Sequence, residues 1–431
     1  MPIPRRLINC VHLKWLTGQL LLAQTVAKTY TASMSKKSHT TILSERELNQ
    51  FSEQLLANSA IDWIAIDTEF VRTDTYFAEL SLVQIQDNFG AVTLIDPLAI
   101  QQNANSTDTS QNLAGLVDIL CNDRLLKVFH AARQDIEVLY QLANKMPASI
   151  FDTQLAAVFF KHGDIAGFAR VVEAELGVKL PKTQTRTNWH ARPLTEEQIE
   201  YAIDDVRFLA PLYEKFKANL TAEQLSAINE DCNALLDERL YKPDPSLAGN
   251  KVKGIRNFKP KQLAMINALA EWRENYAIAN NCPKKWVMSD EVMVCIVKRP
   301  PQVLEALYKV PQIKSSSVRE HGQVWIELID QVFAMSPDNL PKPPPKETPP
   351  TAQQEILINL AMAICQQIAF TNKINLPNLI HKQDVIDLIC HNKTSSLIGW
   401  RSLMIAKPLK ALLDGACLVE IKQQQLVLKS L

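Results

Sequence analysis

The sequence predicts an α/β domain with a mixed sheet, followed by two small all-α domains. Three observations lead to this prediction. Strand-like apolar runs first form an antiparallel meander and then alternate with helical runs, between residues 61 and 160. Helical periodicity without a convincing strand covers residues 259–333. A proline-rich segment, residues 336–350, then precedes a last stretch of helical periodicity, residues 351–431.

The meander consists of three short runs. Residues 61–66 form a mostly apolar run typical of a buried strand. Residues 80–86 and 91–95 are the next strand candidates, and Asn88-Phe89-Gly90 supplies a turn between them. The polar residues 101–112 are expected to be a surface loop.

Strands and helices alternate after the meander. Residues 113–121 are predicted to be helical, residues 126–129 a strand, and residues 134–142 a helix. Asp152-Thr153 is a natural N-cap for an apolar helix that is expected to run to Phe160. Alternation of this kind after a meander indicates a sheet with both parallel and antiparallel strands.

The later part of the chain divides at a linker. Residues 336–350 contain seven prolines in 15 positions, which excludes a helix or a central strand and predicts a semi-rigid linker. The helical part before it begins near residue 250 and ends near residue 335. The helical part after it spans residues 351–431.

Length and composition limit the class of protein. A chain of 431 residues, 47% of them hydrophobic, is too long for one ordinary core. The eight cysteines form no CxxC pair and no cluster with zinc spacing, so reduced thiols and a cytoplasmic location are expected. No stretch approaches the roughly 20 apolar residues of a membrane span, so no membrane partner is expected. Residues 1–39 are expected to be an N-terminal extension outside the fold.

The charges are distributed unevenly although the formal net charge is zero. Residues 60–215 contain 22 Asp and Glu against 13 Lys and Arg, a net charge of −9. Residues 251–320 contain 13 Lys and Arg against 6 Asp and Glu, a net charge of +7. An acidic part that binds a polyphosphate needs cations, and a basic part can supply affinity for phosphates.

Two acids follow the first predicted strand. Asp67 and Glu69 are two residues apart, so on a strand both side chains project from the same face. Two neighbouring carboxylates repel each other unless a cation lies between them, and oxygen ligands favour Mg²⁺ or Mn²⁺. For this pair alone, exposed acids at a strand end remain the alternative.

A tyrosine and an acid share one face of a predicted helix. The helix begins with a capping-box pattern at Thr195 and Gln198. Tyr201 and Asp205 are four residues apart, so their side chains point the same way. A phenol and a carboxylate on one face could hold a metal and the water that attacks a phosphodiester. Asp204 is a rival carboxylate on a different face, and a solvated helix surface is the alternative for the whole pattern.

Asp135 lies in the first turn of the helix that follows His130, at the edge of the sheet where Asp67 is expected. Viewed alone, Asp135 is also explained as an acid favoured by the helix dipole. Asp67, Glu69, Asp135 and Asp205 together suffice for two divalent ions roughly 4 Å apart.

These motifs have the order of a known family. Asp67-Thr-Glu69-Phe70, then His130-Ala with Asp135, then Tyr201-x-x-x-Asp205 resemble the three exonuclease motifs of the DEDD superfamily in its tyrosine-bearing branch. The stretch LGVKLPK with RTNWHARPL, within residues 176–194, resembles the segment before the third motif in bacterial ribonuclease D.

The resemblance implies an RNase H-like exonuclease domain over residues 40–220. It implies that Asp67, Glu69, Asp135 and Asp205 bind two divalent cations, Mg²⁺ or Mn²⁺. It also implies that Tyr201 orients or helps deprotonate the nucleophilic water. We favour orientation, because a tyrosine with an ordinary pKa of about 10 is a poor base at neutral pH and the metal lowers the pKa of the water. In the third motif the acid follows the tyrosine by four residues, so the resemblance selects Asp205 rather than Asp204 as the ligand.

The basic helical part resembles the first HRDC domain of ribonuclease D, on the basis of residues 263–273, 281–287 and 299–300. That resemblance implies an HRDC domain over residues 250–335 and places a second HRDC-like domain at residues 351–431. Lys284 and Lys285 lie beside Trp286, a combination that suits phosphate contact and stacking on a base. A solvated helix face is the alternative.

Four further residues are candidates for substrate contact. Phe70 and Gln84 are expected to touch the 3′-terminal nucleotide, with burial as the alternative. Trp189 is a candidate for stacking on a base and Arg192 for binding a phosphate, with anchoring of the loop as the alternative.

The sequence therefore predicts a 3′→5′ exoribonuclease that acts on structured RNA with a free 3′ end. By the resemblance, tRNA precursors are the substrates and nucleoside 5′-monophosphates the products. Two rival hypotheses remain. A DNA exonuclease would use the same motifs, but an HRDC-like domain without a polymerase or helicase segment favours RNA. A non-catalytic RNA-binding protein is disfavoured because all four acids and the tyrosine are present.

Overall fold

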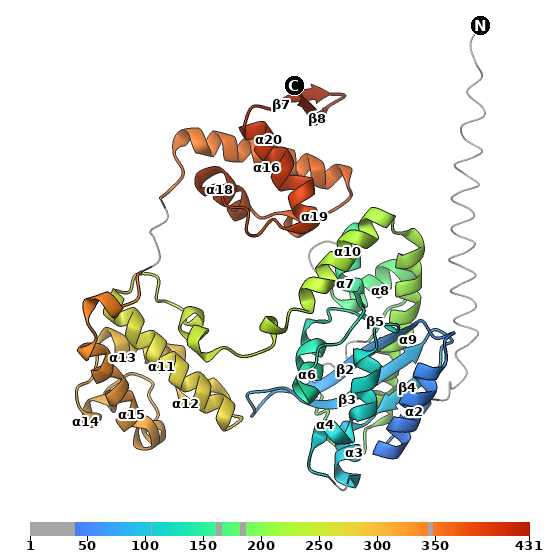
Figure 1. The fold of residues 1–431 in the computed structure, drawn as a ribbon, viewed down its shortest axis with the longest axis horizontal. Coiled ribbons are helices and arrows are strands. Elements are labelled where there is room, and N and C mark those ends of the chain that lie inside the picture. The colour runs from blue at the N-terminus through green and yellow to red at the C-terminus, as the bar shows by residue number, and fades with distance from the viewer. Residues whose placement is uncertain (1–38, 105, 161–165, 182–186, 344–347) are drawn as a thin grey trace.

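The chain folds into three groups of elements, each with its own hydrophobic core (Figure 1). The structure is a computed structural model that describes residues 39–104, 106–160, 166–181, 187–343 and 348–431. The predicted N-terminal extension therefore lies outside the described residues except for His39, where the first strand begins. The linker expected at residues 336–350 is described only in part.

The first group contains a six-stranded sheet in the order β1-β4-β3-β2-β5-β6. Antiparallel pairing joins β2 to β3 and β3 to β4, which is the predicted meander. Parallel pairing joins β1 to β4, β2 to β5 and β5 to β6, so the predicted mixed sheet is confirmed. The strands are β1 (His39–Ile42), β2 (Trp63–Val71), β3 (Glu79–Asp87), β4 (Val92–Ile95), β5 (Leu126–Phe129) and β6 (Ile150–Asp152).

The turn between β3 and β4 forms as the sequence predicts. Gly90 adopts a positive φ of 90°, which a residue with a side chain tolerates poorly. The carboxylate of Asp87 accepts hydrogen bonds from the backbone N–H groups of Phe89 and Ala91, at 3.0 and 2.9 Å. This turn fixes the register of the meander and therefore the face to which each side chain of β3 points.

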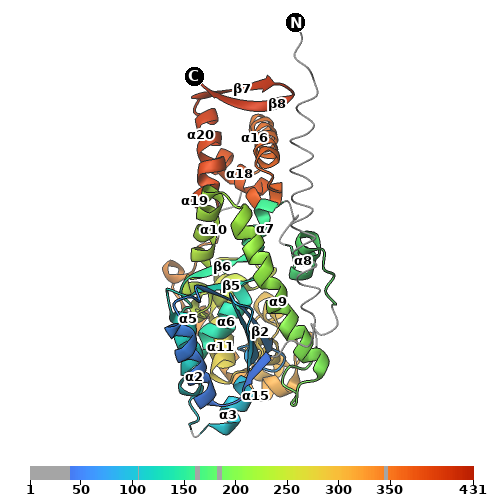
Figure 2. The same ribbon diagram turned by 90° about the vertical axis from the view of Figure 1, so that its right-hand side faces the viewer.

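Helices cover both faces of the sheet: α9 lies on one side of the strands, and α2 with α5 lies on the other (Figure 2). Gly115 allows α5 to pack closely on α2, because a Cβ there would lie 3.0 Å from the carbonyl oxygen of Leu48. The helices are α2 (Glu45–Ala57), α3 (Pro97–Asn103), α4 (Thr109–Asn112), α5 (Ala114–Cys121), α6 (Arg133–Ala143), α7 (Thr153–Ala157), α8 (Phe168–Leu176), α9 (Glu196–Asn219) and α10 (Ala222–Leu235).

Two local predictions need correction. The helix capped by Asp152 ends at Ala157 and continues as the 3₁₀ turn η1 (Val158–Phe160). The expected loop at residues 101–112 is partly helical, because α3 extends to Asn103 and α4 begins after Asp108. The Asp108 carboxylate accepts hydrogen bonds from the first backbone N–H groups of α4, a capping pattern that the polar composition concealed.

The second group is helical throughout, as expected for residues 250–335. Its core surrounds Trp325, which is fully buried on α15. Its main elements are η3 (Pro245–Lys251), α11 (Pro260–Ala279), α12 (Lys284–Val287), α13 (Asp290–Lys298), α14 (Leu304–Leu307) and α15 (Ser315–Ala334).

The second group contacts the first at the loop between β2 and β3. The hydroxyl group of Tyr76 donates a hydrogen bond to the Glu274 carboxylate of α11 at 2.5 Å. The side-chain oxygen of Asn281 accepts from the backbone N–H groups of Tyr76 and Phe77, at 3.1 and 3.2 Å. The loop that follows the acidic end of β2 is thus held against the helical part.

The third group consists of helices and a terminal hairpin: α16 (Ala352–Thr371), α17 (Leu376–Leu379), α18 (Lys382–His391), α19 (Gly399–Arg401), α20 (Lys407–Leu413), β7 (Cys417–Lys422) and β8 (Gln425–Ser430). The all-helical interpretation of residues 351–431 did not include this hairpin. Gln423 and Gln424 form its two-residue turn, both with positive φ, a type I′ geometry that glutamine rarely signals in a sequence.

The third group contacts α10 of the first. Nη1 of Arg401 lies 2.8 Å from Oδ1 of Asp231, and the backbone N–H of Trp400 donates to Glu230 at 3.0 Å. In the part of the chain that the structure describes, no helix has the length and apolar character needed to cross a membrane.

Candidate active site

An acidic cluster forms where β2 meets α9. Asp67 and Glu69 project from the same face of β2, and Asp205 comes from α9, which packs on that strand. One carboxylate oxygen from each of the three residues lies within 4.8 Å of the others. The structure thus brings together three of the four predicted acids.

Burial and mutual repulsion disfavour the charged forms of these acids. Burial raises the pKa of Asp205 to about 8, and Asp204 and Asp135 add to the shift. Burial raises the pKa of Glu69 to about 10, with Asp67 as the next cause. The pKa of Asp67 also lies well above its usual range, through burial and then Asp205. A divalent cation would offset this repulsion, and an all-carboxylate donor set fits Mg²⁺ or Mn²⁺.

Asp135 lies beside this trio in the first turn of α6. It is 7% exposed, and its Oδ1 accepts a hydrogen bond of 2.6 Å from the hydroxyl group of Thr68. Burial, followed by repulsion from Asp67, raises the pKa of Asp135 well above its usual range. Thr68 stands between the two acids of β2, so it ties Asp135 to that strand, a role that the sequence interpretation missed.

The structure distinguishes Asp205 from its neighbour Asp204. Nη1 of Arg207 lies 2.8 Å from Oδ1 of Asp204, so that acid is already paired. Burial raises the pKa of Asp204 only to about 6, because Arg207 opposes the shift. Adjacent residues of a helix point about 100° apart, so only one of the two can face β2. That residue is Asp205.

Tyr201 lies one turn before Asp205 on α9, partly buried against the core. Its ring centroid is 6.0 Å from that of Trp189, and the two rings are tilted by 44°. Trp189 is only 2% exposed, so its ring is part of the core and is not accessible for stacking on a base in this structure. The predicted stacking role of Trp189 is therefore not supported by its position.

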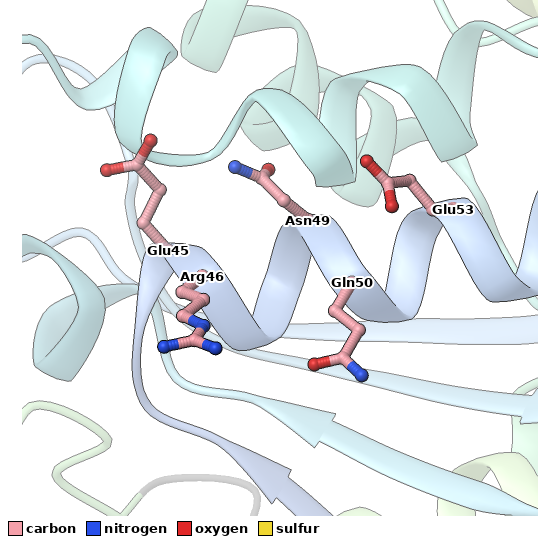
Figure 3. Close-up of a pocket in the computed structure, with 5 residues that line it drawn as sticks. All are labelled: Glu45, Arg46, Asn49, Gln50 and Glu53. Atoms are coloured by element: carbon pink, nitrogen blue, oxygen red, sulfur yellow. The ribbon is translucent and has the colours of Figure 1, made fainter.

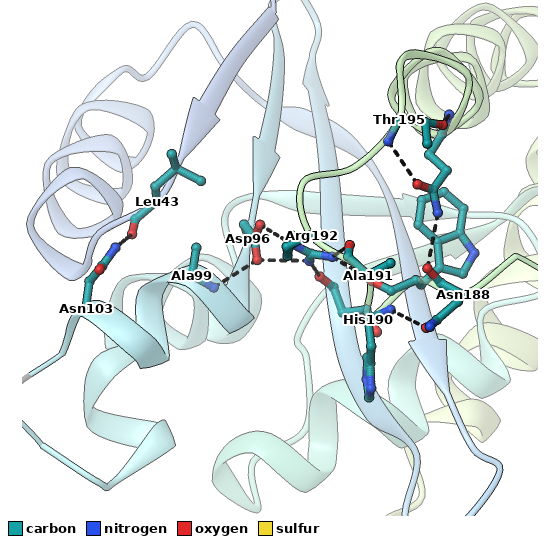
Figure 4. A network of polar contacts seen from close by, with 12 residues as sticks. Leu43, Asp96, Ala99, Asn103, Asn188, His190, Ala191, Arg192 and Thr195 are labelled. Atoms are coloured by element: carbon teal, nitrogen blue, oxygen red, sulfur yellow. Dashed lines mark hydrogen bonds and ion pairs between the residues drawn. The ribbon is translucent and has the colours of Figure 1, made fainter.

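Arg192 anchors the loop that precedes α9 (Figure 4). Its Nε lies 2.6 Å from Oδ2 of Asp96, and its Nη2 donates to the carbonyl oxygen of Ser81 at 2.6 Å. Its Nη1 donates to the carbonyl oxygens of Trp189 and Ala191, at 2.7 and 2.8 Å. These contacts engage the guanidinium group within the protein, so the anchoring alternative describes the structure better than a phosphate contact does.

Gln84 is fully buried on β3, directly opposite Asp67 in the register of the two strands. Neither atom of its side-chain amide has a hydrogen-bond partner among the described residues. Burial, the alternative for Gln84, is therefore observed. Phe70 is partly exposed after a register shift in β2, and its contact with a nucleotide remains a prediction.

The predicted basic contacts on α12 differ from each other. Lys284 Nζ lies 3.2 Å from the Glu274 carboxylate and 5.7 Å from the centre of the Tyr76 ring, so this lysine belongs to the contact between the two groups. Lys285 is exposed, and Trp286 is 50% exposed. Lys285 and Trp286 are therefore the better candidates for contact with a nucleic acid.

A surface hollow on α2 lies apart from these acids in the structure. It is lined by Glu45, Arg46, Asn49, Gln50 and Glu53, all from one helix (Figure 3). None of the four candidate metal ligands lines this hollow, and its lining residues do not form a catalytic constellation.

Comparisons with known proteins agree with the fold. Residues 39–221 match a family model described as 3′–5′ exonuclease, and residues 262–329 match the HRDC domain. A mixed sheet with clustered carboxylates on its central strand, joined to an HRDC domain, is typical of a nuclease of the 3′–5′ exonuclease class.

Curated relatives narrow the class of 3′–5′ exonucleases to one family. Ribonuclease D of Pseudomonas paraeruginosa is 31% identical over 378 residues, which are 84% of this chain and 96% of the relative. Ribonuclease D of Acidiphilium cryptum is 32% identical over 350 residues, or 80% of this chain and 86% of the relative. The chain belongs to the ribonuclease D family and is a 3′–5′ exoribonuclease.

Solved structures show the same relationship. The crystal structure of Escherichia coli RNase D, described as an exoribonuclease involved in structured RNA processing, is similar with a TM-score of 0.75 and 28% identity. The match covers 88% of this chain and 99% of that one. The catalytic core of RRP6 from Trypanosoma brucei shares the fold with a TM-score of 0.53 at 21% identity, over 70% of this chain and 81% of that one.

Proposed function

We propose that this exoribonuclease trims the free 3′ ends of structured RNA, tRNA precursors among them, and releases nucleoside 5′-monophosphates. We further propose that it uses two divalent cations, Mg²⁺ or Mn²⁺. The main support is the cluster of Asp67, Glu69 and Asp205, whose carboxylate oxygens lie within 4.8 Å of one another. Acids with raised pKa values at such spacing are unfavourable without a cation.

The four acids would act as the metal ligands in this proposal. Asp67, Glu69 and Asp205 share one cluster, and Asp135 completes the set from the neighbouring helix. When bound, two such cations supply an activated water and neutralise the charge that develops on the leaving oxygen. Tyr201 would orient that water, because a phenol with an ordinary pKa of about 10 is a poor base at neutral pH.

The organisation of the chain follows from this proposal. Residues 40–220 would be the exonuclease domain, residues 250–335 an HRDC domain and residues 351–431 a second HRDC-like domain, with residues 336–350 as the linker and residues 1–39 as an extension. Lys285 and Trp286 would bind RNA, and Phe70 would contact the terminal nucleotide. A cytoplasmic location is part of the proposal; the seven described cysteines are all free, as expected in a reducing compartment.

Digestion of matched RNA and DNA oligonucleotides tests the proposal. With Mg²⁺ or Mn²⁺ titrated, we expect RNA to shorten from its 3′ end with release of mononucleotides. The Asp205→Asn variant should lose this activity and retain RNA binding, whereas Asp204→Asn, which alters the acid paired with Arg207, should retain most activity. Preference for DNA would contradict the substrate, unchanged trimming by Asp205→Asn would contradict the site, and RNA binding without cleavage would favour the non-catalytic alternative.

A further inference from the structure

One buried acid outside the four candidate ligands contacts two helix N-termini. Asp152 is 2% exposed and is the N-cap residue of α7, where its Oδ1 accepts from the backbone N–H of Gln154 at 2.7 Å. The same Oδ1 accepts from the N–H of Ala131 at 3.0 Å, and Oδ2 accepts from the N–H of Ala132 at 2.9 Å. Only the first of these three bonds is needed to cap α7.

The other two bonds hold the turn that opens α6. Ala132 is the N-cap residue of α6, and its methyl side chain cannot accept a hydrogen bond from the helix. Ala131 has a φ of 62°, in the left-handed region that costs a residue with a side chain roughly 1–2 kcal/mol. Such a conformation persists only where the surroundings impose it. Here the Asp152 carboxylate accepts hydrogen bonds from the backbone N–H groups of both Ala131 and Ala132.

The turn determines where Asp135 lies. Asp135 follows Ala132 by three residues, so its side chain leaves α6 from the first turn. From the other side, the hydroxyl group of Thr68 donates to Asp135 at 2.6 Å. Asp135 is thus held between the strand that bears Asp67 and the turn that Asp152 grips.

His130 strengthens the same connection. Its Nε2 lies 3.0 Å from the carbonyl oxygen of Ala166, and its Nδ1 lies 3.0 Å from the hydroxyl oxygen of Thr153. A carbonyl oxygen only accepts, so Nε2 donates. Both ring nitrogens are therefore engaged beside α7, which agrees with a supporting role for His130 rather than metal ligation.

We propose that Asp152 is a positioning residue for the metal site: by holding the amides of Ala131 and Ala132, it fixes the turn that presents Asp135. This proposal rests on the proposed function, in which Asp135 is a metal ligand. Loss of the grip should weaken metal binding, because groups that orient ligands typically contribute roughly 10- to 100-fold to metal affinity or activity.

The Asp152→Ser variant separates the two roles of the carboxylate. Serine is a good N-cap residue, so its hydroxyl group can replace the bond to Gln154, but it is too short to reach the other two amides. Mn²⁺ binding to the full-length protein without RNA is measured by calorimetry, together with kcat and KM for an RNA oligonucleotide. We expect roughly 10-fold weaker Mn²⁺ binding and lower kcat at limiting Mn²⁺, with KM for RNA unchanged. Asp152→Asn keeps one acceptor oxygen, so its affinity for Mn²⁺ should fall by less than that of Asp152→Ser.

Asp108→Ser is the matched control, because Asp108 also caps a helix, but among the described residues it accepts no hydrogen bond from Ala131 or Ala132. It should bind Mn²⁺ as the wild type does. In an Asp135→Asn background, Asp152→Ser should cause no further loss, since the ligand that it positions is already removed.

Wild-type Mn²⁺ binding by Asp152→Ser, or a full additional loss in the Asp135→Asn background, would overturn the proposal. If Asp152→Ser does not fold, the same comparison with Asp152→Asn decides the question. Wild-type Mn²⁺ binding and trimming by Asp135→Asn alone would instead contradict the proposed site, so the two failures are distinguishable.

Discussion

Removal of one acid from the cluster should stabilise the metal-free protein. The folded-state pKa of Asp205 is raised to about 8, against an ordinary value of about 3.9 in an unfolded chain. The folded state therefore binds more protons than the unfolded state between these values, and its stability falls as pH rises through that window. Above pH 8 and without a cation, the charged carboxylate of Asp205 is buried and repelled by the neighbouring acids. The Asp205→Asn variant removes that charge.

The magnitude follows from the spacing. Two unit charges at most 4.8 Å apart repel by about 3 kcal/mol at an effective dielectric constant of about 20. Because Glu69, with a pKa of about 10, stays largely protonated at pH 8.5, removal of the Asp205 charge relieves at most one repulsion of this size within the trio. With some allowance for relaxation, we expect a gain of about 2 kcal/mol, or an increase in Tm of about 4–8 °C for a domain of this size.

Thermal unfolding monitored by circular dichroism at pH 8.5 measures this effect, first with EDTA and then with excess Mn²⁺. The wild type should gain stability from Mn²⁺, and Asp205→Asn should lose most of that gain. Asp204→Asn is the control, because it relieves some repulsion on Asp205 but also removes the pair with Arg207, so the net gain in stability should be smaller than for Asp205→Asn. A lower Tm for Asp205→Asn in EDTA, or an undiminished gain from Mn²⁺, would refute the reasoning.

Three further predictions concern metal affinity, folding and RNA binding. Because protons compete with a cation for Asp205, the apparent affinity for Mn²⁺ measured by calorimetry should rise between pH 6 and 9, and a flat profile would count against carboxylate ligation. Arg192→Ala should lower the free energy of unfolding in urea by about 3 kcal/mol, because Asp96 stays buried without its cation; the KM for RNA should not change, and an increased KM would restore the phosphate-contact hypothesis. Lys285→Glu should weaken binding to long structured RNA and reduce the salt dependence of that binding, while cleavage of a short oligonucleotide stays the same; equal loss on both substrates would contradict a docking role for this surface.

The sequence predicted features that depend on local patterns. The meander, the alternation after it and the capping box at Thr195 each follow from the periodicity or the caps of neighbouring residues. From the helical pattern alone Asp204 remained a rival, and the resemblance to the third motif, with its tyrosine at Tyr201, selected Asp205; the acidic cluster of the structure contains Asp205.

Features that depend on contacts between distant segments were not predictable in the same way. Arg192 had two interpretations, and only the position of Asp96, on another strand end, selects between them. Trp189 and Gln84 are residue types that bind nucleic acids when exposed, but both are buried here. Exposure depends on how the loop before α9 packs on β3, which no local pattern reports.

The contact of Tyr76 with Glu274 has a mechanical consequence. Its described interactions are polar: hydrogen bonds that typically contribute about 1 kcal/mol each in water, or about 2 kcal/mol to a carboxylate, and the Lys284 ammonium near the Tyr76 ring. If the two groups separate, the hydroxyl, carboxylate and amide groups can all be hydrated, so no buried polar group is stranded. We therefore expect this contact to form and break reversibly while both groups stay folded. The enzyme could then accept structured RNA molecules of different diameter.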